Sequence, residues 1–246
     1  GLDPWALLAG LGLFLFGMHH LEKALQQLAG RSFKVFLRER TSRPVKGVFA
    51  GLLTTIALQS STVVSLLVLA LVGTGIVTLA SAIAIVFGAN LGSTATGWIV
   101  ASVGFKLDIE AVALPLIAAG GLGVVWSAAG SRRLGMSQFV IGLGLMFLGL
   151  DFMKSGASEV ATLFDPEALA AYPLIVFLLA GLLVTAIVHA SSATIMITLS
   201  DLYASAIPLE SAAAVVIGAD LGTTLTAVLA ALAGSAAKKR VAMAIV

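Results

Sequence analysis

The sequence contains the same unit twice. A segment that begins Gln59-Ser60-Ser61-Thr62 returns 130 residues later as His189-Ala190-Ser191-Ser192, and each copy is followed by a second polar cluster at the same spacing. That cluster reads Gly-Ala-Asn-Leu-Gly-Ser-Thr from Gly88 and Gly-Ala-Asp-Leu-Gly-Thr-Thr from Gly218. Over the aligned segments roughly 15 of 48 positions are identical without a gap, which indicates an internal duplication. The chain must therefore fold into two related halves, whose shared polar residues stand in otherwise apolar sequence.

Composition predicts a helical protein that crosses a membrane several times. Hydrophobic residues make up 59% of the chain and charged residues 11%, a balance typical of polytopic membrane proteins. The net charge of +2 is too small to suggest binding to nucleic acid. The sequence has no cysteine, which excludes disulfides and thiolate metal sites.

The charged segments between the apolar stretches indicate the topology. Short cytoplasmic loops collect Lys and Arg, and these residues are dense in 30–46, 131–133 and 238–240. If every apolar stretch crossed the membrane, the first two of these segments would lie on opposite sides. The conflict disappears if 47–73 and 171–200 are re-entrant hairpins that enter and leave on one side. Both hold a Ser/Thr motif near the middle, where a turn would have to lie.

With the hairpins excluded, each copy has three true crossings. Because this number is odd, the two copies are inverted with respect to each other. We expect a first repeat over 1–133 and a second over 134–246, the second truncated at its C-terminal end. Inverted repeats with broken helices that meet near the midplane are the architecture of many secondary transporters. The predicted fold is thus an all-α polytopic membrane protein of two inverted-topology repeats, each with a re-entrant helical hairpin.

The hairpin tips are the first candidate site. Ser and Thr are good N-cap residues, so we expect half-helices to begin near Thr62 and near Ser191-Ser192. Helix N-termini present unpaired N–H groups and the positive end of the helix dipole, which suits a small oxyanion. The alternative is that these hydroxyls only hydrogen-bond between helices, but their presence at symmetric positions favours the anion site.

The second polar cluster is a candidate cation site. Asp220 is the one carboxylate predicted near mid-bilayer, where an ionised group costs about 2.5–3.5 kcal/mol and usually lines an ion path. Asn90 is its neutral counterpart. Carboxylate, amide and hydroxyl oxygens are hard ligands that suit Na⁺. The alternative is that the glycines of the cluster form faces for close helix packing.

The motif segments lack basic side chains. No Lys or Arg occurs between Lys46 and Lys106, or between Lys154 and Lys238. Helix dipoles supply only fractional charge, so an anion bound by these motifs must be neutralised by cations that travel with it or by protonated His189. Ion coupling is expected for this reason.

Titratable residues end the first apolar stretch, 5–25. We interpret this group as a solvated helix end at the cytoplasmic surface, and it comprises His19, His20, Glu22 and Lys23. Their counterparts Asp151 and Lys154, in the second copy, receive the same interpretation.

Taken together, the duplicated Gln-Ser-Ser-like motifs and Gly-Ala-Asn/Asp-Leu-Gly clusters resemble the type II sodium–phosphate cotransporter family. The resemblance covers roughly residues 5–240. It implies a sodium-coupled symporter for inorganic phosphate, multi-pass in the cell inner (plasma) membrane, with Na⁺ as coupling ion and no other cofactor. The second copy departs from the family pattern at His189-Ala190, where Gln-Ser is expected, so the roles of these two positions stay open.

Carried over by position, the resemblance implies two sets of site residues. Phosphate is expected at Ser60, Ser61, Thr62, Ser191, Ser192 and Thr194. Sodium is expected at Gln59, Asn90, Ser93, Thr94, His189, Asp220, Thr223 and Thr224. The expected partners are phosphate, sodium, the lipid bilayer, a second copy in a homodimer and a soluble PhoU-like domain beyond residue 246.

Other functions stay open at this stage. The chain could carry another small oxyanion, couple to protons instead of sodium, or act as a passive anion channel or sensor. An intramembrane serine hydrolase would use Ser191 or Ser192 with His189 as base. The first copy has Gln59 at the matching position, which cannot act as a base, and so a transporter is predicted and not an enzyme.

Overall fold

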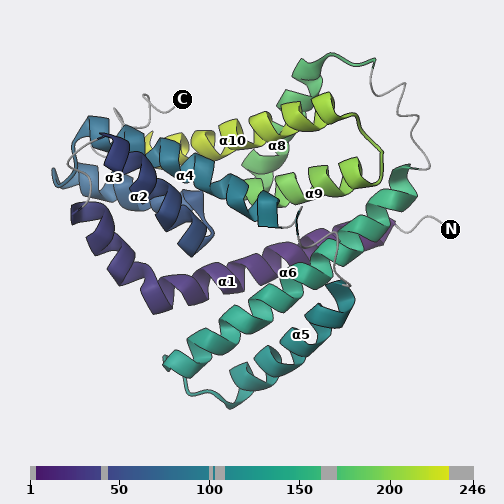
Figure 1. Ribbon diagram of the computed structural model, residues 1–246, viewed down its shortest axis with the longest axis horizontal. Helices are drawn as coiled ribbons and strands as arrows, with labels where there is room; N and C mark the ends of the chain where they lie inside the picture. The colour runs from purple at the N-terminus through teal and green to yellow at the C-terminus, as the bar shows by residue number, and fades with distance from the viewer. Residues whose placement is uncertain (1–3, 40–43, 100–101, 103–108, 162–170, 233–246) are drawn as a thin grey trace.

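The computed structural model shows a protein built from helices (Figure 1). It describes residues 4–39, 44–99, 102, 109–161 and 171–232. Segment 238–240, which was used to orient the chain, lies outside the described residues. In chain order the helices are α1 (Pro4–Glu39), α2 (Pro44–Leu58), α3 (Ser61–Gly73), α4 (Leu79–Ile99), α5 (Ile109–Trp126), α6 (Arg132–Ala161), α8 (Leu174–Val188), α9 (Ser191–Tyr203) and α10 (Leu209–Leu232).

Several of these helices are apolar enough for a bilayer. By length and composition, four spans among the described residues could cross it: Trp5–Ala29, Leu79–Ile99, Ile109–Trp126 and Arg132–Glu159. Helices α2, α3 and α8 are apolar but have only 15, 13 and 15 residues. A helix needs roughly 20 residues to cross the hydrocarbon, so these three are too short to span it alone. The chain is a multi-pass membrane protein with additional half-length helices.

The centre of the molecule is the antiparallel pair of α1 and α6, which lie side by side (Figure 1). Glycines let the two backbones touch: a Cβ at Gly10 would lie 2.7 Å from the carbonyl oxygen of Gly149, and a Cβ at Gly142 would lie 2.7 Å from that of Gly17. Gly10 and Gly17 are the sequence counterparts of Gly142 and Gly149. The same contact is therefore made twice with the partners exchanged, as in an approximate two-fold arrangement.

The two halves repeat a second set of contacts, in which a glycine meets a carbonyl of the partner helix. These pairs are Gly88 on Val48, Gly92 on Leu52, Gly218 on Leu178 and Gly222 on Leu182. In each half the paired numbers rise together, so α2 runs parallel to α4 and α8 runs parallel to α10. The helix between them must return from the end of one to the start of the other. Helices α2–α3 and α8–α9 are therefore helical hairpins, and the expected packing role of the cluster glycines is confirmed.

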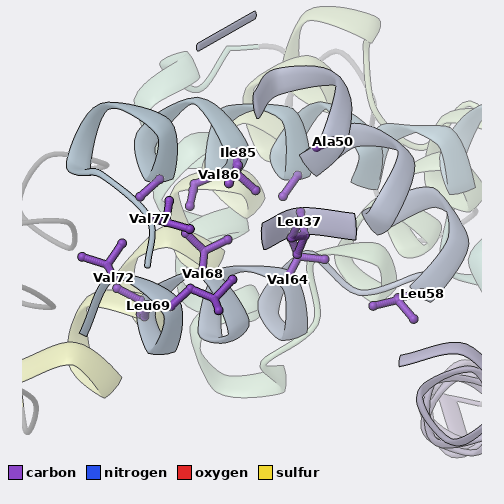
Figure 2. Packing of buried hydrophobic residues seen from close by; sticks show 13 residues of the cluster. Leu37, Ala50, Leu58, Val64, Val68, Leu69, Val72, Val77, Ile85 and Val86 are labelled. Atoms are coloured by element: carbon purple, nitrogen blue, oxygen red, sulfur yellow. The ribbon is translucent and has the colours of Figure 1, made fainter. Parts of the chain in front are cut away.

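The first hairpin has an apolar core shared with α1 and α4 (Figure 2). Val64 and Val68 of α3, Ile85 of α4 and Leu37 near the end of α1 are fully buried there. Because lipid tails are as apolar as these side chains, close packing rather than transfer from water drives such contacts in a membrane.

Helix α1 is much longer than the apolar stretch 5–25 suggested. It continues to Glu39, because apolar side chains at helical spacing, including Leu21, Ala24 and Leu37, keep one face buried beyond the first charges. The interpretation of His19 and Glu22 as a solvated helix end was wrong, since both lie near the middle of α1. Asp151 and Lys154 likewise lie within α6 and are half-buried.

Candidate functional site

Both hairpins turn through a residue in the left-handed backbone conformation. Gln59 has a φ of 55° and His189 a φ of 57°, and they occupy the same place in the two copies. This conformation costs an L-residue roughly 1–2 kcal/mol, and strained residues of this kind cluster at functional sites. The break expected near the middle of each hairpin is confirmed at these residues.

The half-helices that follow the turns differ slightly from the prediction. The first begins one residue earlier than Thr62, and the second has no side-chain cap. Helix α3 starts at Ser61, and its N-cap Ser60 accepts a hydrogen bond on Oγ from the N–H of Val63 at 3.3 Å. Helix α9 starts at Ser191, and its N-cap is Ala190, which forms no side-chain cap. Ser191 and its neighbour thus lie in the first turn, where N–H groups lack helical partners, and not at the cap.

The two tips line one cavity of about 340 Å³. Its walls come from four parts of the chain: α1, the α2–α3 turn, α4 and the α8–α9 turn. Polar side chains dominate where the two turns meet, and the lining residues include Gln59, Ser60, Ser61, Thr62, His189, Ser191 and Ser192 together with Ser93 of α4. Eight of the fourteen residues expected at the site are therefore brought together.

The other six expected residues do not line this cavity: Thr194, Asn90, Thr94, Asp220, Thr223 and Thr224. The hydroxyl of Thr194 shares a buried hydrogen bond with that of Thr185, 2.7 Å away. Thr94 and Thr224 donate to carbonyls one turn back in their own helices, both at 2.7 Å, and the hydroxyl of Thr223 does the same at 3.3 Å. Asn90 and Asp220 are half-buried on α4 and α10.

The cavity also contains residues that the motifs did not indicate, all on one face of α1. These are Leu15, Met18, His19 and Glu22. The carboxyl of Glu22 forms a side-chain hydrogen bond with Ser60, and Ser192 Oγ donates to the sulfur of Met18 at 2.8 Å. Each tip therefore touches α1. The sequence signal that could have indicated these four residues is their i, i+3, i+4, i+7 spacing, which places them on one helix face.

Thr55 of α2 belongs to the cavity wall and has a buried hydroxyl that is not satisfied. Its side chain is 1% exposed, lines the cavity, and has no hydrogen-bond partner for Oγ1 among the described residues. Its counterpart Thr185 bonds Thr194, but the residue equivalent to Thr194 in the first copy is Val64. A buried hydroxyl without a partner costs about 1–3 kcal/mol, so the first half carries a cost at this position that the second half avoids.

Comparison with known proteins decides the family. The Na⁺/Pi-cotransporter family matches residues 13–155 and 170–246. The chain belongs to this family. The resemblance inferred from the motifs is confirmed, and the family is one of phosphate transporters and not of enzymes.

Three relatives of the chain within this cotransporter family differ in their names and in their lengths. The Bacillus subtilis protein YqeW is 32% identical over 241 residues, which cover 94% of the chain and 74% of that relative. The Escherichia coli protein YjbB, provisionally named an inorganic phosphate export protein, is 27% identical over 96% of the chain and 43% of its own length. Mouse sodium-dependent phosphate transport protein 2A is 33% identical over 97 residues, 39% of the chain and 15% of that protein. No solved structure matches the chain.

Proposed function

We propose that the protein carries inorganic phosphate across the cell membrane together with sodium, and that the cavity between the two hairpin tips is the binding site. One observation carries this proposal: the N-terminal ends of α3 and α9, from different halves of the duplication, open onto the same polar cavity. Two helix N-termini directed at one point favour an anion. Membership of a phosphate transporter family supports phosphate as the anion.

The arrangement of helices supports inverted repeats. Equivalent helices α1 and α6 are antiparallel, and the hairpins α2–α3 and α8–α9 consist of helices too short to cross a bilayer. If α1 and α6 both span the membrane, the two halves have opposite orientations, and the hairpins enter from opposite sides. Irregular backbone at their tips then survives because it faces protein and a polar cavity instead of lipid.

Phosphate is expected to bind the hydroxyls of Ser60, Ser61, Thr62, Ser191 and Ser192 and the free N–H groups of the first helical turns. Hydrogen bonds to a charged ligand are the stronger kind. Thr194, which bonds Thr185 behind the second tip, holds that tip in place. Among the described residues that line the cavity none is Lys or Arg, so the charge of phosphate must be balanced by ions that bind with it.

Sodium is expected next to the phosphate, at oxygen atoms of the same cavity. Gln59, Ser93 and Thr55 are in its wall, and hydroxyl and amide oxygens suit Na⁺. His189, at the position equivalent to Gln59, also lines the cavity. For Asn90, Thr94, Asp220, Thr223 and Thr224 a sodium role requires a site outside this cavity.

The test is uptake of radioactive phosphate into proteoliposomes that contain the purified protein. With an inward sodium gradient we expect saturable uptake that accumulates phosphate above its external concentration, which a passive channel cannot do. Replacement of sodium by choline should abolish this accumulation. Equal uptake in sodium and choline would exclude the sodium symporter.

Export of phosphate is the second candidate function, and the name of the Escherichia coli relative favours it. A coupled carrier moves its substrates in whichever direction the combined gradients favour. Vesicles preloaded with phosphate distinguish the two: efflux that is accelerated by an outward sodium gradient supports one reversible symporter. Efflux that responds to a pH gradient and ignores sodium would instead indicate a proton-coupled exporter.

A further inference from the structure

A carboxyl group lies in the cavity beside the proposed phosphate ligands. Glu22 lies in the middle of α1, is partly buried, lines the cavity and is hydrogen-bonded to Ser60, the N-cap of α3. It is the one acidic residue among the described residues that line the cavity. The other titratable groups there are His19, one turn earlier on the same helix, and His189 at the opposite tip. Lys23, the next residue of α1, is exposed.

This placement conflicts with anion binding unless Glu22 is neutralised. Two negative charges close together in a poorly solvated cavity repel each other strongly, and neither Lys nor Arg is found among the described lining residues. Glu22 therefore has to carry a cation when phosphate binds.

We propose that Glu22 and Ser60 form a binding position for one monovalent cation, Na⁺ or a proton, and that this position must be filled before phosphate can bind. The proposal rests on the function proposed above, because it assigns the order of binding in the same cavity. It also explains why Ser60 is present only in the first copy, where it joins α3 to the carboxyl of α1.

The duplication does not supply a second such position. The counterpart of Glu22 is Lys154, whose ammonium group lies 5.4 Å from the centroid of the Tyr203 ring, at the far end of α9 from the tip. The counterpart of Ser60 is Ala190, which cannot bind a cation through its side chain. One such cation is therefore expected per phosphate, on the side of the cavity formed by the first hairpin.

The main test compares Glu22→Gln with Glu22→Asp and with Glu110→Gln, a control at an exposed position on α5. Phosphate binding to the purified full chain is titrated against sodium at several values between about pH 5.5 and 8.5. If Na⁺ fills the position, Glu22→Gln should raise the half-saturating sodium concentration by about 5- to 150-fold. It should also lower the Hill coefficient of the sodium titration. If a proton fills it, Glu22→Gln should leave the sodium titration unchanged and flatten the pH dependence of phosphate binding. Glu22→Asp should retain the wild-type behaviour in part.

The proposal is overturned if Glu22→Gln matches the Glu110→Gln control in both the sodium titration and the pH profile. A second measurement needs no variant: a hydrophobic carbodiimide is applied to the wild-type protein and modification of Glu22 is mapped by mass spectrometry. Sodium or high pH should slow the modification, and a rate that depends on neither contradicts the proposal. If wild-type uptake does not depend on sodium, but sodium or high pH still slows the modification of Glu22, the sodium symporter is contradicted and the proposed cation position is not.

Discussion

The two hairpin tips have the same backbone conformation but differ in their side chains. Gln59 and His189 adopt the same left-handed conformation, and each is followed by a helix that opens onto the cavity. In the first tip Ser60 caps α3 and contacts Glu22, whereas in the second Ala190 does neither. The duplication thus preserves the turn that builds the proposed anion site, whereas the surrounding side chains differ between the two copies.

The polar groups behind the tips show the same divergence. Thr185 is satisfied by Thr194 in the second half. In the first half the residue equivalent to Thr194 is Val64, and Thr55 has no hydrogen-bond partner for its hydroxyl among the described residues. The Thr185–Thr194 hydrogen bond of the second half therefore has no counterpart in the first half. We infer that the first tip carries most of the cation binding and that both tips contact phosphate.

The largest expected effect tests whether the halves are packed alike. Gly88→Ala and Gly218→Ala each place a methyl group on a backbone carbonyl of the partner helix, which cannot move aside as a side chain could. Both should therefore destabilise the protein by at least about 3 kcal/mol. The midpoint of thermal unfolding in detergent measures this effect.

Gly12→Ala is the matched control, because a Cβ at Gly12 meets no atom of the described chain within 4 Å. It should be neutral or stabilising by up to about 1 kcal/mol through helix propensity. If one of the two cluster glycines tolerates alanine as well as Gly12 does, the two halves are not packed in the same way.

A smaller effect is expected at the proposed phosphate ligands. Ser61→Ala and Ser191→Ala each remove one hydroxyl from the first turn of a half-helix and should each raise the half-saturating phosphate concentration about tenfold. Initial rates of phosphate uptake at saturating sodium provide the measurement. If only one variant changes the phosphate dependence, a single tip binds phosphate.

How far the sequence could predict this site is visible at particular residues. The breaks at Gln59 and His189 followed from the repeat, because duplicated polar residues in apolar surroundings indicate a shared irregular feature. Glu22 was missed because its charge follows an apolar run and resembles a helix end. Hydropathy averages over all sides of a helix, but the buried face of α1 is defined by contacts with segments distant in sequence.

Asp220 is the opposite case. Its place in a repeated cluster predicted a cation site, and the structure leaves it on α10 outside the cavity, so a sodium role for this residue stays a prediction. Sequence equivalence shows that two residues have similar local structure. It does not show which face of the helix points to the cavity, since that depends on how the glycine contacts align α10 with α8.

The next prediction concerns the threonine pairs behind the tips. Thr194→Val breaks the hydrogen bond to Thr185 and leaves a buried hydroxyl unsatisfied, so it should destabilise the protein by about 1 kcal/mol. Thr55→Val removes a hydroxyl that has no protein partner among the described residues and should be neutral or slightly stabilising in the absence of ligand. Equal losses of thermal stability in the two variants would contradict the asymmetry.

The smallest effect is expected from a substitution that restores the missing N-cap of α9. Ala190→Ser gives α9 the N-cap that Ser60 provides to α3, where it should accept a hydrogen bond from the N–H of residue 193. A stabilisation of about 0.5–1 kcal/mol is expected, measured as a rise in the unfolding midpoint. A lower midpoint would mean that the second tip has no room for the hydroxyl.

The most direct test of the central claim is the sidedness of equivalent positions in the two halves. The chain has no cysteine, so Thr74→Cys, after α3, and Ala204→Cys, after α9, can be labelled singly with a membrane-impermeant maleimide in oriented vesicles. Inverted re-entrant hairpins predict that residue 74 reacts only from the cytoplasmic side and residue 204 only from the opposite side. Labelling of both positions from the same side would show that the hairpins do not enter from opposite faces, and the proposed site between them would lose its basis.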